Sequence, residues 1–405
     1  MAKIVMVVPA HSYRSEAFLE AAARAGHDLL LVTDALIPAA GKTWQVERLG
    51  LDQQEIAAVA RDLESHHPDL VIGVDEQSIK LAAALSDELR LTSGRSAAIS
   101  IATDKAAFRS RLAEAELAQP RYIVSNLDHL AAGGDEQLRI ETAALGDDLV
   151  IKPTDCTASR GVIRTGRAGL ADAARLLRRG LGEDSPVLVE EYLEGPEYAI
   201  EAVTTGFDLE ILDIFAKPEI GSGPYFWESF YVGTAPLAKQ ALEEVRALVG
   251  RAVVALSLRD TPIHAELRVT ASGPKLLEVA PRTIGGRCSA SLRFSGGRRL
   301  EDVVLDRALG NRSEARPRLR PHGIYMISTP ADGVFERVEG IRECLAVPGI
   351  TGLEITTKPG THVFAPPFTT EYLGFAFAEG KSHREVLTAL RRARATLKPV
   401  VRPSN

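Results

Sequence analysis

The first hundred residues alternate short apolar runs with helical patterns, and this alternation constrains the fold more than any other feature of the chain. Continuous apolar runs, which are typical of buried parallel strands, occur at Ile4–Val8, Leu29–Thr33 and Leu70–Val74. Helical patterns at Glu16–Ala25 and Gln53–Glu64 separate these runs. The resulting β-α-β-α-β order predicts a small doubly wound parallel domain at the N-terminus.

The rest of the chain has a different pattern. Strand patterns dominate from about residue 120 to residue 310 and are interrupted by helical ones, which predicts α+β layers instead of a second doubly wound sheet. A charged, proline-rich stretch at 311–321 predicts a linker or an exposed turn. The region after it contains more strands and a basic helix, Ser382–Leu397, whose charges we expect on a solvated face.

Composition excludes several classes of protein. The 405 residues are 45% apolar and 25% charged, as in globular proteins and unlike disordered chains. A net charge of −6 is unfavourable for general nucleic-acid binding. No apolar stretch reaches the roughly 18 residues of a transmembrane helix, so we expect no membrane partner. Three distant cysteines predict no disulfide framework, and a reducing cytoplasm is the expected compartment.

The strongest chemical signal is a predicted β-hairpin with two carboxylates on one face. Two strand patterns flank the turn Thr-Ala-Ser-Gly-Pro at 270–274. If Glu266 lies opposite Glu278, the two carboxylates share one face of the hairpin. Its apolar residues, including Leu277, then share the other face. This pairing brings the two carboxylates to about 5 Å between Cβ atoms, where a hard divalent cation such as Mg²⁺ would relieve their repulsion. The alternative is a solvated polar face on which Arg268 neutralises one of the glutamates.

Two further segments suit a nucleotide. Lys152 ends an apolar strand before a loop of small residues containing Gly161, as in phosphate sites, although no Walker A sequence is present. The segment Val187–Glu201 predicts a strand, a short linker and a second strand, whose linker backbone can hydrogen-bond an adenine edge. An exposed lysine beside an ordinary loop, and an ordinary strand-turn-strand, are the alternatives. Upstream, Asp104 is a plausible N-cap for a helix that begins with Lys105.

In this order, these segments resemble the ATP-grasp superfamily of carboxylate–amine (or thiol) ligases. The resemblance covers roughly residues 1–310. It implies a fold of the α/β and α+β classes, with a Rossmann-like first domain and two α+β lobes that grip ATP. Because a further region follows, in which Phe364–Phe377 resembles an extra domain, the chain is similar to the L-amino-acid (dipeptide) ligase group. The expected regions are a first domain at 1–95, a small lobe at 96–185, a large lobe at 186–310 and a C-terminal ligase-type domain at 311–405.

The resemblance also implies roles for single residues. Those expected to contact the ATP phosphates are Lys105, Lys152, Thr157, Ala158, Ser159, Arg160, Gly161 and Val162. Those expected at the adenine and the ribose are Glu190, Glu191, Tyr192, Leu193 and Glu197. Glu266 and Glu278 are the implied ligands of Mg²⁺ or Mn²⁺, and Arg282 is the implied partner of the transferring phosphoryl group. The resemblance places Arg287 at a substrate carboxylate.

Three positions leave alternatives open. Many family members have Asn two positions after the second Glu, whereas this chain has Ala280, so one metal ion or two are both compatible with the pattern. His264 would either assist amine deprotonation or serve as a hydrogen-bonded scaffold residue. An aromatic cluster would either line a substrate pocket or pack into a small satellite core, and the substrate residues proposed from it are Lys217, Tyr225, Phe226, Trp227 and Glu228.

The expected function is ATP-dependent ligation of a small-molecule acid to an amine, with both substrates expected to be amino acids. Alternatives are a biotin-carboxylase-like enzyme, a purine-pathway ligase, and a non-catalytic ATP-binding regulator. The purine-pathway ligase would need a basic patch near Arg287, Arg298 and Arg299 for a sugar phosphate. A homodimer is compatible with the resemblance, because dimers are common in the superfamily.

Overall fold

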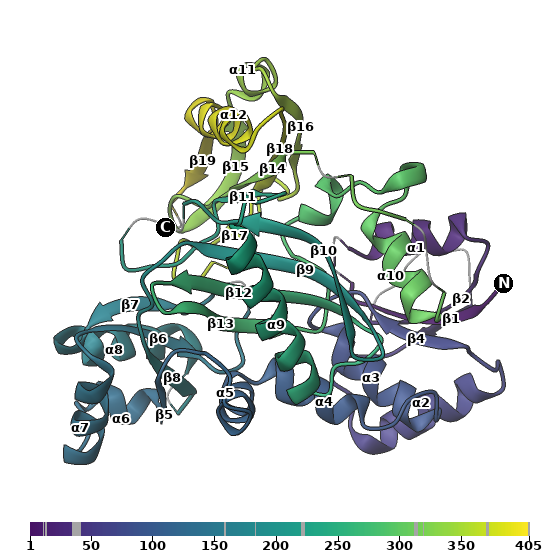
Figure 1. Cartoon of the computed structure of the whole chain (residues 1–405), viewed down its shortest axis with the longest axis horizontal. Coiled ribbons are helices and arrows are strands. Elements are labelled where there is room, and N and C mark those ends of the chain that lie inside the picture. Colours follow the sequence, from purple (N-terminus) through teal and green to yellow (C-terminus); the bar gives the residue numbers. More distant parts are fainter. Residues whose placement is uncertain are drawn as a thin grey trace.

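The computed structural model describes residues 1–403 except 11, 13, 35–41, 158, 183, 220–222, 312–314, 319 and 370–371. The N-terminal domain and the small lobe lie at opposite ends of the molecule, and the large lobe lies between them (Figure 1). The C-terminal domain rises from the large lobe on a third side (Figure 1).

The N-terminal domain contains the predicted parallel sheet, with strand order β3-β2-β1-β4. Its elements are β1 (Lys3–Val8), α1 (Ser15–Arg24), β2 (Asp28–Thr33), β3 (Lys42–Gln45), α2 (Gln53–Glu64), β4 (Leu70–Gly73) and α3 (Ser78–Glu88). The sequence analysis missed β3, because this short edge strand has a single apolar residue, Trp44, in its four positions. Otherwise the apolar runs became strands that are buried at most positions.

The small lobe is built on an antiparallel sheet of order β5-β8-β6-β7. The chain enters it through α4 (Arg95–Thr103) and α5 (Lys105–Glu114), and Asp104 caps α5 as predicted by accepting the Ala107 N–H at 2.8 Å. The other elements are β5 (Tyr122–Asn126), α6 (Leu127–Ala131), α7 (Glu136–Leu145), β6 (Asp148–Pro153), β7 (Ile163–Gly166), α8 (Leu170–Leu181) and β8 (Pro186–Glu191).

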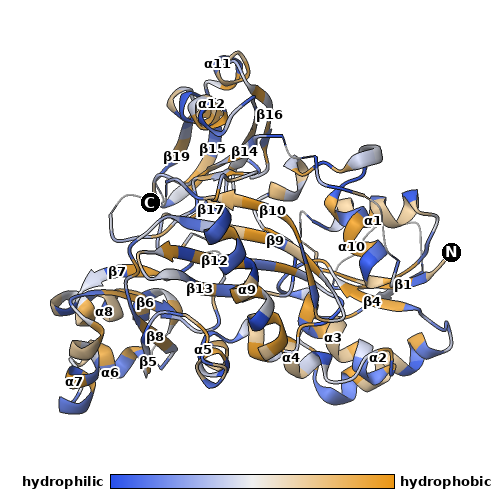
Figure 2. Ribbon diagram, in the orientation of Figure 1, coloured by the Kyte–Doolittle hydropathy of each residue, from blue (hydrophilic) through white to orange (hydrophobic). Residues whose placement is uncertain are grey.

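One eight-stranded sheet, of order β13-β12-β9-β10-β11-β14-β18-β16, runs from the large lobe into the C-terminal domain. Its strands are β9 (Glu197–Thr205), β10 (Asp208–Ala216), β11 (Phe230–Val232), β12 (Pro262–Thr270), β13 (Gly273–Ala280), β14 (His322–Ile327), β16 (Ile350–Ile355) and β18 (Gly374–Glu379). Antiparallel pairing of β11 with β14 makes the connection. Strands β9, β10 and β12 are largely apolar (Figure 2), and α9 (Lys239–Ala255) packs beside them. The α10 helix (Leu300–Ala308) contacts α1 of the N-terminal domain.

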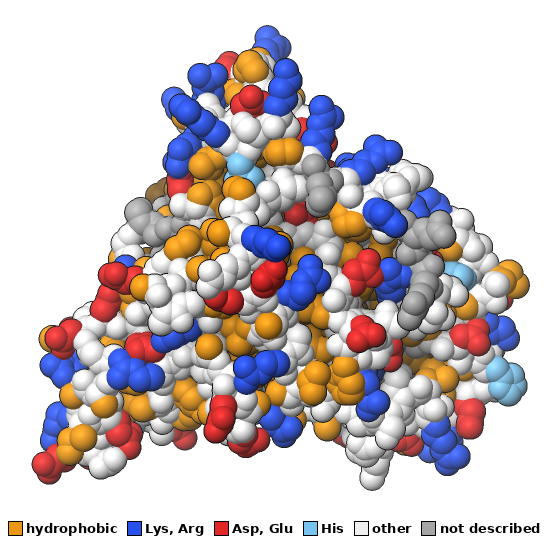
Figure 3. Space-filling view, in the orientation of Figure 1, with side chains coloured by type: hydrophobic (Ala, Val, Ile, Leu, Met, Phe, Trp, Pro, Cys, Tyr) orange, Lys and Arg blue, Asp and Glu red, His pale blue; other side chains and the backbone are white. Residues whose placement is uncertain are grey.

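The C-terminal domain adds a small antiparallel sheet of β15 (Gly333–Glu339), β17 (His362–Val363) and β19 (Lys398–Arg402). Its helices are α11 (Ile341–Leu345) and α12 (His383–Thr396). Lys and Arg side chains gather over this domain (Figure 3), and the prediction of a solvated basic face on α12 is confirmed, since its apolar residues alone are buried. Among the described residues, no helix has the length and apolar character needed to cross a bilayer.

The β12–β13 hairpin has the predicted register at its two glutamates. Glu266 pairs with Glu278 across β12 and β13, but a β-bulge follows, and Leu267 then faces Leu276. Leu276 is fully buried, whereas Leu277 is partly exposed and turns toward the cavity described below. The prediction that Leu277 shares the buried face was therefore wrong, because the bulge inserts one residue into the alternation.

A buried arginine ties the small lobe to this hairpin. Arg109 on α5 is fully buried, and its guanidinium donates to Glu190 of β8 at 2.7 Å. The same group donates to the carbonyl oxygens of Leu276 and Leu277 at 3.1 and 2.9 Å. One side chain thus holds both lobes and the bulge in register.

We predict that Arg109→Ala destabilises the protein by about 3–5 kcal/mol, because it leaves two carbonyl groups without their donor and the buried Glu190 with only one of its two cations. Urea unfolding followed by tryptophan fluorescence measures the change. Arg111→Ala is the matched control, since Arg111 lies on the same helix in an exposed pair with Glu114 and should cost about 0.5 kcal/mol. Equal losses in the two variants would contradict the structural role of Arg109.

Candidate active site

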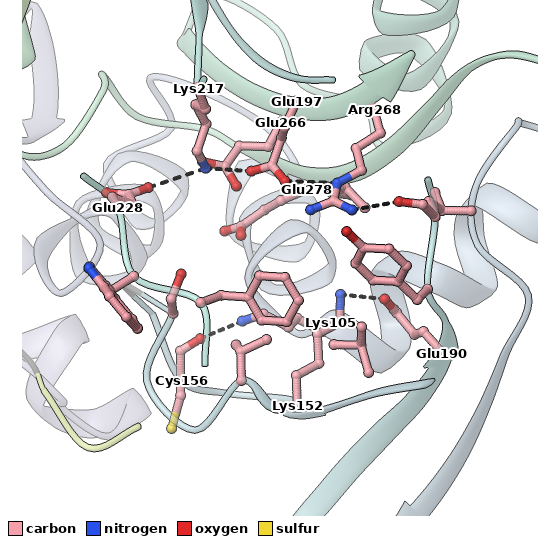
Figure 4. Close-up of a pocket in the computed structure, with 18 of the residues that line it drawn as sticks. Lys105, Lys152, Cys156, Glu190, Glu197, Lys217, Glu228, Glu266, Arg268 and Glu278 are labelled. Carbon is pink, nitrogen blue, oxygen red and sulfur yellow. Dashed lines mark hydrogen bonds and ion pairs between the residues drawn. The ribbon is translucent and has the colours of Figure 1, made fainter. Parts of the chain in front are cut away.

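A cavity that is open to solvent lies between the small lobe and the β12–β13 hairpin, with about 850 Å³ of non-protein space including the solvent at its mouth. In Figure 4, lysines of the small lobe lie on the opposite side of the cavity from carboxylates of the large lobe. The cavity is lined by Lys105, Val150, Lys152, Cys156, Thr157, Ser159, Val162, Glu190, Glu191, Tyr192, Leu193, Glu197, Lys217, Phe226, Trp227, Glu228, Glu266, Arg268, Leu277 and Glu278.

Most of the residues predicted from sequence are brought together in this lining. Ala158 lies outside the described residues. The predicted residues that do not line the cavity are Arg160, Gly161, Tyr225, His264, Arg282 and Arg287. Tyr225 packs against the small-lobe core, which is the satellite packing considered for the aromatic cluster, whereas Phe226 and Trp227 face the cavity.

The small lobe supplies two lysines. The Lys152 ammonium lies 2.9 Å from the Glu190 carboxylate, and the Lys105 ammonium donates to the Cys156 carbonyl oxygen. Burial lowers the pKa of Lys152 to about 8, although the Glu190 charge opposes the shift. The Glu190 carboxylate is occupied by Lys152 and Arg109, so its side chain positions a lysine.

The loop between β6 and β7 closes this side of the cavity. Two turns shape it. The Arg160 N–H donates to the Thr157 carbonyl oxygen at 3.1 Å, and the Val162 N–H donates to the Ser159 carbonyl oxygen at 3.2 Å. Thr157, Ser159 and Val162 reach the cavity. The side chains and backbone of this loop therefore lie beside both lysines, as the phosphate-loop prediction requires.

A stacked aromatic group forms one wall. The Tyr192 ring lies between two guanidinium groups, 3.6 Å from that of Arg164 and 4.7 Å from that of Arg268, and Phe226 stacks on it at 6.4 Å. Cation–π contacts on Tyr192 hold the ring in place. Together with Val150, Leu193 and Leu277, this wall is apolar and suits a flat purine base.

On the large lobe, Lys217 is buried among three carboxylates. Its ammonium lies 2.6 Å from Glu197, 2.9 Å from Glu266 and 3.5 Å from Glu228. Burial alone would lower the pKa of Lys217, but the three negative charges outweigh it and raise the pKa well above the usual value. Glu197 also accepts from Arg268 at 3.0 Å. The lysine is thus a permanent cation beside the predicted metal ligands.

The carboxylate pair fits a divalent cation that shares its ligands with a substrate. Burial would raise the pKa of Glu266, but Lys217 and His264 hold it well below its usual value, so this carboxylate stays ionised. Glu278 lines the cavity, and its carboxylate makes no hydrogen bond or ion pair with any described residue. Among the described residues no group of three His, Cys, Asp or Glu side chains is arranged around a metal position. The donor set therefore suits Mg²⁺ that takes further oxygens from phosphates and water.

His264 supports Glu266 from behind. Its Nδ1 lies 2.6 Å from Glu201 and its Nε2 lies 3.4 Å from Glu266, on a side chain that is 5% exposed. Burial lowers the pKa of His264, but the hydrogen bonds with Glu201 and Glu266 outweigh it and raise the pKa to about 9. An imidazolium with that pKa keeps its proton at neutral pH, which favours the scaffold role over the role of a base.

The two predicted arginines point to the other domains. Arg282 donates to Glu76, at the end of β4, at 2.6 Å, and Arg287 lies 2.6 Å from Glu354 of β16. Burial would raise the pKa of Glu76, but Arg282, Lys105 and Arg14 lower it. Arg282 thus connects the large lobe to the N-terminal domain, and the Lys105 charge acts on the same carboxylate.

Arg287 lines a second cavity of about 820 Å³ between α1, α10 and β16. Its charged lining consists of four arginines and four glutamates: Arg14, Arg287, Arg293, Arg299, Glu16, Glu20, Glu301 and Glu354. Arg298 does not line it and pairs with Asp306 at 2.5 Å. The cavity is thus charge-balanced and is not a purely basic patch.

Comparison with known proteins agrees with this geometry. Residues 145–291 match the ATP-grasp domain, and residues 325–402 match the L-amino acid ligase C-terminal domain 2. The first match contains the loop between β6 and β7, the aromatic wall and both carboxylates. The chain therefore contains an ATP-grasp domain. The second match follows the ATP-grasp match in the sequence and lies in the C-terminal domain.

Relatives of this ATP-grasp protein share its fold across the whole chain. An L-amino acid ligase from Bacillus licheniformis superposes with a TM-score of 0.79 at 22% identity, covering 99% of both chains. An N5-carboxyaminoimidazole ribonucleotide synthetase from Thermotoga maritima superposes with a TM-score of 0.72 at 14% identity, covering 99% of this chain and 100% of that one. At these identities the likeness concerns the fold alone.

A curated relative is similar in sequence over part of its length. The uncharacterized protein y4rH of Sinorhizobium fredii (strain NBRC 101917 / NGR234) is 28% identical over 296 residues. The match takes in 72% of this chain and 59% of that protein. The ATP-grasp protein thus covers less than two thirds of the length of this relative.

Three of the contributors that sequence reasoning missed show why it did so. Arg109 left no signal, because a single arginine in a helical pattern is ordinarily exposed. Glu76 follows a parallel strand at its carboxyl end, where ligands of such sheets bind, and that position could have marked it. Leu277 was assigned to the wrong face because bulges are not visible in an alternating pattern.

We predict that ATP affinity is constant up to about pH 8 and then falls about tenfold per pH unit, because Lys152 must be charged to hold phosphate and its pKa is about 8 before ATP binds. The sign follows from linkage, since the bound phosphates stabilise the protonated form. Titration calorimetry from pH 7 to 9.5 measures it. Lys152→Arg keeps its charge throughout and should show a flat profile, so a parallel fall in both proteins would contradict the assignment.

Proposed function

We propose that this ATP-grasp protein is an ATP-dependent carbon–nitrogen ligase that joins a carboxylic acid to an amine through an acyl-phosphate. One observation carries the proposal. Lys105 and Lys152 lie across a single cavity from Glu266 and Glu278, with an apolar wall beside them. Phosphoryl transfer chiefly requires positioning and neutralisation of charge, and these residues supply both.

In the proposed reaction, an oxygen of the substrate carboxylate attacks the γ-phosphorus of ATP, and the bond to the β,γ-bridging oxygen breaks to release ADP. The amine nitrogen then attacks the acyl carbon, loses a proton and expels phosphate. Lys105 and Lys152 hold the phosphates, and Lys217 and His264 keep Glu266 ionised and oriented. Bound Mg²⁺, held by Glu266 and Glu278, would neutralise the phosphate oxygens. Arg282, next to Glu76, is the proposed partner of the transferring group.

The proposed substrates are amino acids. The second cavity supports this class, because its four arginines and four glutamates suit a zwitterion, in which a carboxylate and an ammonium are both present. A phosphorylated sugar would bring about two negative charges to a lining that offers no excess of positive ones. In addition, Phe226, Trp227 and Glu228 give the first cavity an aromatic and an acidic contact.

The decisive experiment measures phosphate release from Mg·ATP with the standard amino acids, singly and in pairs, with mass spectrometry of the products. A ligase of this type releases phosphate when both components are present and yields the pair minus water. Release that depends on bicarbonate would favour a biotin-carboxylase-like enzyme. Tight ATP binding without release under any pair would favour the non-catalytic regulator.

We predict that Glu278→Gln lowers turnover by about 100-fold or more, because it removes one of two carboxylates that hold the cation. Stability should change by less than about 0.5 kcal/mol, since Glu278 has no partner among the described residues. Glu243→Gln is the control, as Glu243 is exposed on α9. Turnover at the wild-type level in Glu278→Gln would refute the metal assignment.

A further inference from the structure

A segment of the C-terminal domain reaches across to the phosphate loop of the small lobe. It lies between β17 and β18, and its carbonyl oxygen at Pro367 accepts the Gly161 N–H at 2.7 Å. Gly161 has a φ of +74°, and a Cβ there would lie 2.8 Å from the Pro153 ring. Glycine therefore suits the conformation that the loop adopts at this contact. Figure 1 shows β17 on the side of the C-terminal domain that faces the small lobe.

The next residue of this segment enters the small lobe itself. Phe368 packs against the small-lobe core formed by α6, α8 and the sheet. A Cβ placed on Gly180 of α8 would lie 2.3 Å from the Phe368 ring, so the helix surface is open at this point only because Gly180 has no side chain. The Phe368 N–H donates to the Ala365 carbonyl oxygen at 3.1 Å, and the Ala365 N–H donates to the Asp332 carboxylate at 2.7 Å. These two bonds hold the segment to its own domain.

The same region also touches the loop that carries the aromatic residues. Tyr372 donates to Glu228 at 3.1 Å, and Glu228 is a neighbour of Lys217 in the cavity. On the other side of that loop, the Pro224 carbonyl oxygen accepts the Arg164 N–H of β7 at 2.6 Å. The C-terminal domain therefore contacts the phosphate loop at Gly161, and the aromatic loop contacts the strand that follows it at Arg164.

The geometry points to Ala365–Phe368 as a clasp by which the C-terminal domain positions the phosphate loop, with Phe368 as the positioning residue. The small lobe has its own sheet, separate from the eight-stranded one, so contacts between the lobes decide where its loop lies. While the clasp contacts the small lobe, Thr157 and Ser159 stay across the cavity from Glu266 and Glu278. If the proposed ligation is correct, the clasp also keeps water from an acyl-phosphate; this consequence rests on the proposed function, whereas the positioning does not.

The test uses the full-length protein and readouts that need no ligation. Hydrogen exchange of the peptide that covers residues 155–164 reports opening at Gly161 directly, because its N–H is the bonded group. Phe368→Ala should speed this exchange by about tenfold and weaken ADP binding, measured by calorimetry, by about threefold or more, since a smaller fraction of molecules then has a formed site. Phe368→Leu, which refills part of the space, should restore most of both values.

Two matched variants separate the clasp from a general loss of stability. Phe364→Ala removes the same side chain from the same segment at a position that is 53% exposed, and it should leave both readouts unchanged. Gly180→Ala displaces the Phe368 ring from the opposite domain, and it should reproduce Phe368→Ala even though alanine favours the helix. In the double variant the two effects should not add. Equal exchange and affinity in Phe368→Ala and Phe364→Ala would overturn the proposal, whether or not the protein proves to be a ligase.

Discussion

The structure depends on one buried carboxylate that two cations hold from different elements. Glu190 is 3% exposed, and it binds Arg109 of α5 and Lys152 of β6 at 2.7 and 2.9 Å. A carboxylate at this depth is tolerable only when it is paired and hydrogen-bonded. The pairing fixes the direction of Lys152 toward the cavity, and through Arg109 it fixes the bulge that turns Leu277 into the apolar wall. Charge neutralisation inside the small lobe thus shapes a site that is completed by the large lobe.

Local pattern was sufficient for much of the fold and for the facing carboxylates of the candidate site, whereas the roles of the other site residues came from the family resemblance. Apolar runs located three of the four strands of the N-terminal sheet, and the match of the two faces placed Glu266 opposite Glu278. Pattern failed where the backbone departs from regular alternation, as at the bulge beside Leu277. It also failed where a contact joins distant segments: Arg109 meets a carbonyl group 167 residues away, and Arg282 meets a carboxylate 206 residues away. Such pairs leave no trace in residue spacing, since only the packed lobes bring them together.

The comparisons separate what the scaffold determines from what it leaves open. Chains with 14% and 22% identity adopt the same arrangement over nearly their full length, although their names describe different ligations. Backbone architecture therefore says little about the acceptor. In this chain, the features that would distinguish acceptors are the loop with Phe226, Trp227 and Glu228, and the balanced charges of the second cavity. The second cavity is assembled from side chains of more than one domain.

The continuous eight-stranded sheet has a consequence for recombination between relatives. Because β11 of the large lobe pairs with β14 of the C-terminal domain, a chain cut near residue 310 would leave the β11 edge with unsatisfied backbone groups. Bare strand edges recruit other chains and promote aggregation. The C-terminal domain is therefore not an exchangeable module in the way its separate place in the sequence suggests. A functional chimera would have to inherit both sides of the β11–β14 ladder from one parent, so the two domains are expected to evolve as a single cooperative folding unit.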